Sequence, residues 1–407
     1  MAALDAYEEE HLERLLRVGT CLAQCGYGAQ VGQLAATART FRGDAQLWTA
    51  HARHRGPRGR TALTQAAWTG NAPRIQFLLE RGTDVEAVEE DGSTALMRAC
   101  YKGHSLAAHL LVERGAANVN ATMTPDGMTA LMLASSGGHV EIVRLLVERG
   151  GGANVNAAQT DDGFTALMWA SQNGHLETVR ILVERGGANV NAVTTTTGVT
   201  ALMWACQMGH LEIVRILVEH GGANVNALKT TDGATALIRS SGYGHLEIVR
   251  FLVESGGASV HAACTDDGYT ALLCASKSGH LAIVRFLVEL GGASVWTSDS
   301  SGATVLIVAS KYGHLEVVRY LLERGSVVNA VRGACGKTAL MFASMKGHAA
   351  VVRLLLENGA LKRLVSHAGR TAHDLAANPL VLAELEGAED SEEEEEEEDS
   401  EEEEEEE

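Results

Sequence analysis

The sequence predicts an all-α solenoid of stacked helix-turn-helix units with β-turn finger loops, followed by a disordered acidic tail. A Gly-His pair recurs at steps of 34 to 36 residues, and a fixed period in this range is typical of stacked repeats. Each copy holds two short segments with helical apolar spacing, separated by glycine. Residues 389–407 hold 17 carboxylates and no basic residue, a composition typical of disorder.

Each unit is predicted to hold a turn followed by two short helices. A turn signal such as Asp162-Gly163 opens it, and Thr165 two residues later is placed to cap a helix. The first helix reads Leu-Met-x-Ala-Ser and ends at a glycine such as Gly174. The second reads Leu-Glu-Ile-Val-Arg-x-Leu-Val-Glu, an amphipathic stripe that ends at a glycine such as Gly186. One such pair cannot bury its apolar face alone, so neighbouring pairs must stack.

These residues, Gly-x-Thr-Ala-Leu-Met…Ala…Gly-His-Leu-Glu-Ile-Val-Arg-x-Leu-Val-Glu…Val-Asn-Ala, resemble the ankyrin repeat. The resemblance covers residues 57–384 with about nine repeats and a partial C-terminal one. The first copy carries Asn71 in place of the histidine, and Asn378-Pro379 predicts the cap and start of a closing helix. The units read Thr-Ala-Leu-Met where the family has Thr-Pro-Leu-His, and they exceed its usual length of about 33 residues.

The predicted domains are an N-terminal helical segment (1–56), the solenoid (57–384) and the acidic tail (385–407). The net charge is −19, but without residues 389–407 the chain has 35 acidic and 33 basic residues. A nearly neutral body argues against nucleic acid as a partner.

The seven cysteines occupy no fixed position in the repeats, and no apolar run is long enough for a membrane span or a signal peptide. We therefore expect an intracellular, reducing location, cytoplasmic or nuclear, with no membrane partner.

The resemblance implies that finger tips and first helices line a concave binding face. The residue before the Ala of the first helix varies most between copies, and helical rotation predicts that it is a surface position. Trp169 and Trp204, which occupy it, are expected to pack on each other, to form an anchor patch, or to do both in part. The partner-binding candidates are Tyr101, Lys102, Phe164, Trp169, Gln172, Asn173, Trp204, Gln207, Met208, Arg239, Tyr243, Tyr269, Lys277, Lys311, Tyr312, Phe342 and Lys346.

No catalytic constellation, cofactor motif or metal site is predicted. The Gly-His histidines should lie about 10 Å apart in a stack, too far to share a zinc ion, so we expect a structural role for them. Gly336-Lys337-Thr338 is similar to the end of a phosphate loop, but Val331 stands where the loop needs its first glycine.

The order of apolar residues from Leu12 to Trp48 is similar to an F-box, the helical motif that binds the adaptor of cullin-type ubiquitin ligases. The alternative is a helical cap on the first repeat. The sequence therefore predicts a non-enzymatic protein-interaction scaffold, a monomer with a protein partner. The alternative function is that of a substrate receptor of such a ligase.

The acidic tail invites two interpretations. It either serves solubility alone or folds back over Lys277, Lys311 and Lys346, which occupy related concave positions in three successive repeats.

Overall fold

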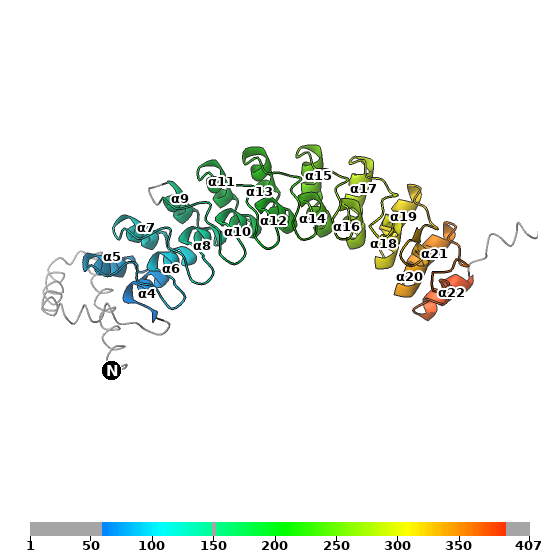
Figure 1. Cartoon of the computed structure of the whole chain (residues 1–407), viewed down its shortest axis with the longest axis horizontal. Coiled ribbons are helices and arrows are strands. Elements are labelled where there is room, and N and C mark those ends of the chain that lie inside the picture. The colour runs from blue at the N-terminus through cyan, green and yellow to red at the C-terminus, as the bar shows by residue number, and fades with distance from the viewer. Residues whose placement is uncertain (1–58, 149–151, 388–407) are drawn as a thin grey trace, which may run out of the picture.

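The computed structural model describes residues 59–148 and 152–387 of the chain. They form one curved row of helical hairpins, with the first helices along the inner, concave side of the arc and the second helices along the outer side (Figure 1). The predicted all-α repeat solenoid is confirmed.

Nine hairpins lie within the described residues, followed by a closing helix, α22 (Pro379–Gly387). The first helices are α4 (Ala62–Thr69), α6 (Ala95–Lys102), α8 (Ala130–Ser136), α10 (Ala166–Asn173), α12 (Ala201–Met208), α14 (Ala236–Tyr243), α16 (Ala271–Ser278), α18 (Val305–Tyr312) and α20 (Ala339–Lys346). The second helices are α5 (Ala72–Glu80), α7 (Ser105–Glu113), α9 (Val140–Glu148), α11 (Leu176–Glu184), α13 (Leu211–Arg215) continued by the π-helical turn η3 (Ile216–His220), α15 (Leu246–Glu254), α17 (Leu281–Glu289), α19 (Leu315–Glu323) and α21 (Ala349–Glu357).

The helix ends follow the capping residues that the sequence places there. Thr165 Oγ1 accepts a hydrogen bond from the backbone N–H of Met168, and the equivalent threonine does so at every first helix. Gly174 after α10 has φ +80°, a left-handed conformation that favours glycine. Asn71 caps α5, and Asn378 Oδ1 accepts from the N–H of Val381 to cap α22. The predicted caps are confirmed.

One apolar spine runs the length of the array. Leu167 and Met168 of α10 and Val179 and Leu182 of α11 are at most 2% exposed, and their equivalents join one contiguous core from Leu63 to Leu385. First helices pack on first helices and second on second. Each hairpin therefore completes its core only against its neighbours.

The Gly-His pairs join each repeat to the one before. His210 Nε2 lies 3.2 Å from the carbonyl oxygen of Gln172. A carbonyl oxygen only accepts, so Nε2 carries the proton. The ring lies against Gly174, where a Cβ would come within 2.7 Å of it. Equivalent bonds are made by His104, His139, His175, His245, His280, His314 and His348.

Two further ladders link the repeats. Asn156 donates through Nδ2 to the carbonyl of Gly187 and accepts through Oδ1 from the N–H of Asn189. In the fingers, the N–H of Thr195 donates to the carbonyl of Asp162 at 2.9 Å, and equivalent bonds join the other fingers. The finger of the ninth repeat forms a short antiparallel pair, β1 (Val331–Arg332) and β2 (Lys337–Thr338).

The contact between glycine and histidine should be measurable. Gly174 and Gly187 both have positive φ, but a Cβ at Gly187 meets nothing within 4 Å. We expect Gly187→Ala to lower the free energy of unfolding by about 1 kcal/mol through backbone strain. Gly174→Ala should cost about 1 kcal/mol more, because the methyl group displaces His210 from its carbonyl partner. Urea unfolding followed by circular dichroism measures both.

The same two substitutions in a chain without His210 show whether the imidazole causes the extra loss of stability. In the His210→Ala chain the two alanine variants should lose similar stability, since no ring remains to be displaced. An undiminished excess cost of Gly174→Ala in that background would contradict the assignment.

Candidate protein-interaction surface

Each repeat brings two variable positions together on the concave side. One is the residue before the Ala of the first helix, here called the inner-face residue. The other is the residue five or six places before the capping threonine, here called the finger residue. Arg98 and Glu89 form such a pair in the second repeat, and Trp169 and Gln159 in the fourth.

The exposure expected for the inner-face position is wrong for three repeats. Leu133, Val308 and Phe342 are 7%, 2% and 4% exposed. In the ninth repeat Arg332 and Lys337 of the finger lie over the Phe342 ring, at 5.9 and 5.7 Å from its centroid. The finger thus covers the helix face that a helical wheel leaves open.

The residues at the predicted finger tips also differ in exposure. Phe164 and Val199 are buried at 9% and 3% exposure, whereas Tyr269 is half-buried. Phe164 and Phe342 therefore support the surface from beneath and do not present an open face to a partner.

The N-terminal end of the concave side carries an aromatic and cationic cluster. Tyr101 stacks on Trp68 with ring centroids 6.0 Å apart, and Lys102 Nζ lies 4.1 Å from the Trp68 ring centroid. Such contacts between a cation and an aromatic face contribute about 0.5 to 1 kcal/mol at exposed sites. Trp68 is not among the predicted residues, although its place two residues before Gly70 matches that of Tyr101 before Gly103.

Arg98 is neutralised within its own repeat. Its Nη2 atom lies 2.6 Å from Glu89 and 2.7 Å from Asp91. Burial alone would raise the pKa of Asp91, but hydrogen bonds from Ser93 and the charge of Arg98 outweigh it and lower that pKa. This charge is satisfied without a partner.

The centre of the concave side is an aromatic cluster. The Phe164 ring lies between those of Trp169 and Trp204, with centroids 5.0 and 5.5 Å away. The two tryptophans thus share a phenylalanine between them. Trp169 Nε1 donates to Gln159 Oε1 at 2.9 Å, which satisfies its only polar atom.

A cavity of about 320 Å³ opens beside this cluster. Phe164, Val199 and Trp204 form its apolar wall, and Lys229 and Arg239 bring positive charge. The Asp162 carboxylate also lines it, with its Oδ1 atom accepting the N–H of Phe164. Trp204 Nε1 and Arg239 Nε are buried without a hydrogen-bond partner among the described residues. Burial lowers the pKa of Arg239 despite the opposing charge of Asp232, but an arginine side chain stays charged at neutral pH.

The C-terminal end carries cations stacked on rings. Lys277 Nζ lies 5.2 Å from the ring centroid of Tyr269 and 5.9 Å from that of Tyr312. Lys311 Nζ lies 5.4 Å from Tyr312 and 6.0 Å from Phe342. Burial and the charge of Asp299 raise the pKa of Tyr269 to about 12. Lys346 is exposed at the end of α20.

The remaining predicted residues lie at the ends of first helices. Gln172 and Gln207 accept the histidine bonds through their backbone carbonyls, and Asn173 Nδ2 donates to the carbonyl of Ser136. Met208 and Tyr243 are 48% and 56% exposed. The structure therefore brings the predicted residues into three adjoining zones along one face. Whether that face binds a partner stays a prediction.

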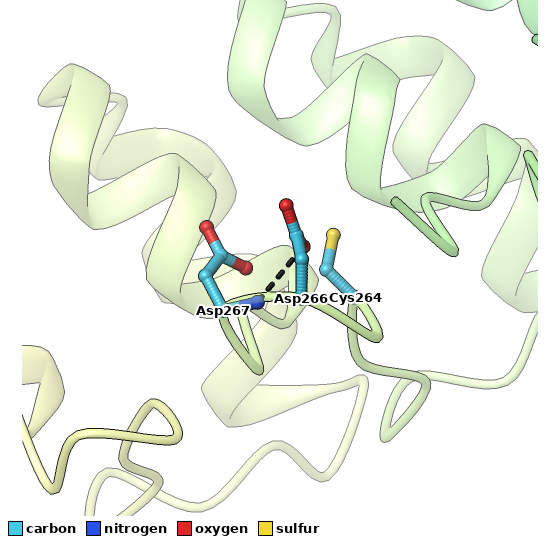
Figure 2. A group of neighbouring side chains, drawn as sticks. All are labelled: Cys264, Asp266 and Asp267. Atoms are coloured by element: carbon cyan, nitrogen blue, oxygen red, sulfur yellow. Dashed lines mark hydrogen bonds between the residues drawn. The ribbon is translucent and has the colours of Figure 1, made fainter. Parts of the chain in front are cut away.

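Cys264, Asp266 and Asp267 form a group whose ligand atoms lie within 4.8 Å of one another in the finger before α16 (Figure 2). The N–H of Asp267 donates to Asp266 Oδ1, and the N–H of Tyr269 donates to Asp267 Oδ1. Asp161 and Asp162 make the same two bonds in the fourth repeat, so turn geometry accounts for the group. Burial and nearby carboxylates raise the pKa of Cys264 to about 11, so its thiol is neutral at physiological pH.

The fold and this face define a helical repeat protein with an extended concave surface. Sequence models of ankyrin repeats match residues 34–123, 117–194, 186–264 and 257–332, and a single-repeat model matches 335–365. The matches cover well over half of the chain, which therefore belongs to the ankyrin-repeat family.

Two curated relatives are the Notch-regulated ankyrin repeat-containing proteins of Xenopus tropicalis and Xenopus laevis. Each is 41% identical over 49 residues, which is 12% of this chain and 43% of the relative. The chain thus spans less than half of each relative's length in these matches.

The F-box-like stretch, 12–48, and the segment 1–56 lie outside the described residues. The ankyrin sequence match itself begins at residue 34. Among the helices of the described ranges, none combines the length and apolar character needed to cross a bilayer.

The raised pKa of Cys264 has a chemical consequence. At pH 8 a thiol with a pKa near 11 is about 0.1% thiolate, against roughly a quarter for an ordinary cysteine. We expect Cys264 in the native chain to react with iodoacetamide at least about tenfold more slowly than in the urea-unfolded chain. Peptide mass spectrometry after timed quenching measures the rate. Micromolar zinc should leave this rate unchanged, and protection by zinc would contradict our account of the cluster.

Proposed function

We propose that this chain is a non-enzymatic protein-interaction scaffold that binds a protein partner through the concave face of its ankyrin solenoid. The repeats keep their capping, glycine, histidine and core residues almost unchanged, while the finger and inner-face residues differ from copy to copy. Divergence at one face, with the packing residues held constant, is what partner recognition requires of a repeat array.

The composition of that face carries the proposal. Tyr101, Met208 and Tyr243 are each about half exposed on successive parts of it, beside half-buried tryptophans and stacked lysines. Large aromatic side chains and arginine dominate the binding energy of protein interfaces. A polar surface evolved for solubility alone would place few of them there.

The composition of the chain also bears on its oligomeric state and location. We expect a monomer that needs no cofactor and resides in the cytoplasm or nucleus. The five cysteines of the described ranges carry free thiols, as expected in a reducing compartment.

The alternative function is a substrate receptor of a cullin-type ubiquitin ligase, with residues 12–48 binding the adaptor. The spacing of Leu12, Leu15, Leu22 and the Leu47-Trp48 pair favours it. A pull-down with the isolated 1–56 segment would recover the adaptor if this alternative holds. Failure to recover it leaves a cap on the first repeat.

The scaffold proposal can be tested with exposed residues, whose replacement spares the core. The variant Tyr101→Ser/Met208→Ser/Tyr243→Ser changes the concave face, and Leu106→Ser/Leu290→Ser changes residues 63% and 67% exposed on or after second helices. Affinity purification with quantitative mass spectrometry should show partners depleted about tenfold by the concave variant and retained by the control. Equal recovery with both variants would contradict the proposal.

The two central tryptophans can be replaced in the same affinity-purification experiment. Trp169→Ala/Trp204→Ala should also deplete the partners, but these side chains are half-buried, so circular dichroism must first show that the variant is folded.

A further inference from the structure

Within the described residues, the concave cations of the C-terminal repeats have no ion-pair partner. Among the described residues, no carboxylate lies within ion-pair distance of Lys277, Lys311, Arg332, Lys337 or Lys346, whereas Arg215, Arg319, Arg324 and Arg353 pair with glutamates on or near the second helices. Asp267 and Asp299, in nearby fingers, accept backbone N–H bonds in their own turns. The inner side of these repeats therefore presents a row of unpaired positive charge, here called the cation track.

Aromatic rings hold the track in place. Lys277 and Lys311 lie over Tyr269, Tyr312 and Phe342, and Lys337 also lies over Phe342. Contacts of this kind restrict the lysine chains while leaving their charge available to an anion. The track thus runs in order through the seventh, eighth and ninth repeats.

The cavity at Arg239 continues the track into the fifth and sixth repeats. The equivalent positions of other repeats hold a hydrogen-bond acceptor that this cavity lacks. In the second repeat the finger residue Glu89 binds Arg98, and in the fourth Gln159 binds the Trp169 N–H. In the fifth, Thr194 instead bonds Thr197 and the N–H of Val199, so Trp204 Nε1 stays unpartnered.

In the sixth repeat the finger residue is itself a cation. Lys229 pairs with Asp232 at 2.7 Å, and among the described residues Arg239 has no ion pair and lies over the Trp204 ring. The unpartnered atoms of Trp204 and Arg239 are both donors, so the missing group is an acceptor. A carboxylate fits best, because it accepts charge-assisted hydrogen bonds from arginine.

The chain carries its own supply of carboxylates in the residues that follow α22. Residues 389–407 hold 17 of them in 19 positions and begin just after α22, which packs on α21 and is tied to it by the ion pair of Arg353 and Glu384. The path from α22 to α14 crosses about four repeat steps of about 10 Å each. Nineteen extended residues reach roughly 65 Å, enough to cover it.

We propose that residues 389–407 bind in cis along the cation track and place one glutamate carboxylate in the cavity, where it accepts hydrogen bonds from Arg239 and Trp204. The tail then occupies the concave face and competes with an outside ligand. Competition with a protein partner rests on the proposed function, but the intramolecular contact does not.

A fluorescein-labelled peptide of residues 388–407 tests the contact by anisotropy. The acceptors are the full-length chain and a full-length tail-neutral variant in which every Glu→Gln and Asp→Asn change is made within 389–407. We expect the tail-neutral chain to bind the peptide at least about tenfold more tightly, since the native tail no longer competes. Equal affinity for the two chains, or no binding to either, would overturn the proposal.

The site is tested in the tail-neutral background. Arg239→Gln should weaken peptide binding about tenfold, the loss of one charge-assisted hydrogen bond. Lys277→Gln/Lys311→Gln/Lys346→Gln should weaken it at least as much and reduce its salt dependence. The control Arg215→Gln/Arg250→Gln/Arg319→Gln removes the same charge from second helices and should leave affinity unchanged. Equal loss from the control would show non-specific attraction and overturn the assigned site.

Circular dichroism of each variant excludes unfolding as the cause of lost binding. The outcome is separable from the proposed function. If the peptide fails to bind while partners depend on Tyr101, Met208 and Tyr243, the tail contact is wrong and the proposed scaffold function stands. If the peptide binds and no partner depends on the concave face, the tail contact stands and the scaffold function is wrong. Tighter binding by an unrelated acidic peptide than by the tail sequence would assign the cavity to a partner segment and overturn the cis assignment.

Discussion

The array depends on the contact between a glycine that ends one first helix and the histidine that opens the next repeat's second helix. The glycine lacks the Cβ that would collide with the imidazole, and its left-handed backbone ends the helix there. The same imidazole donates to a carbonyl that the helix end leaves without a partner inside the helix. One residue pair thus fixes helix length, satisfies a backbone acceptor and sets the approach of neighbouring repeats.

The ladders and the spine follow from that register. Once the histidines set the step, the finger amides meet the carbonyls of the preceding finger, and the asparagines reach the next connector. The asparagine ladder is interrupted at His261 and Trp296, where the sequence changes, and resumes at Asn329. Trp296 Nε1 instead donates to the carbonyl of Gly325 and leaves its ring 67% exposed. Redundant links allow the array to lose one ladder locally, because each interface contributes its own share of stability.

Sequence reasoning predicted what is local or periodic. The threonine caps, the glycine ends, the closing helix at Asn378 and the structural histidines each depend on residues a few positions apart or on the repeat step. The burial of Leu133, Val308 and Phe342 depends on how each finger lies over its helix, which no helical wheel contains. The cavity could not be predicted either, because it arises where two successive repeats differ in their finger residues, Thr194 and Lys229. The two tryptophans occupy equivalent positions in the sequence, and they differ only because Gln159 accepts from one while Thr194 leaves the other without an acceptor.

The unpaired guanidinium of Arg239 is costly in physical terms. A partly desolvated charge without hydrogen bonds destabilises the folded chain. In the second repeat, the finger residue Glu89 avoids this cost by pairing with Arg98. A glutamate at position 229 would supply the missing acceptor, yet the chain places a lysine there and so adds positive charge. A repeat array tolerates such a local cost, because its stability is a sum over many interfaces and not the property of one core. A carboxylate that enters the cavity would offset this cost. The cavity is therefore a site where an incoming anionic group gains binding energy, and the acidic run that follows α22 is long enough to reach it.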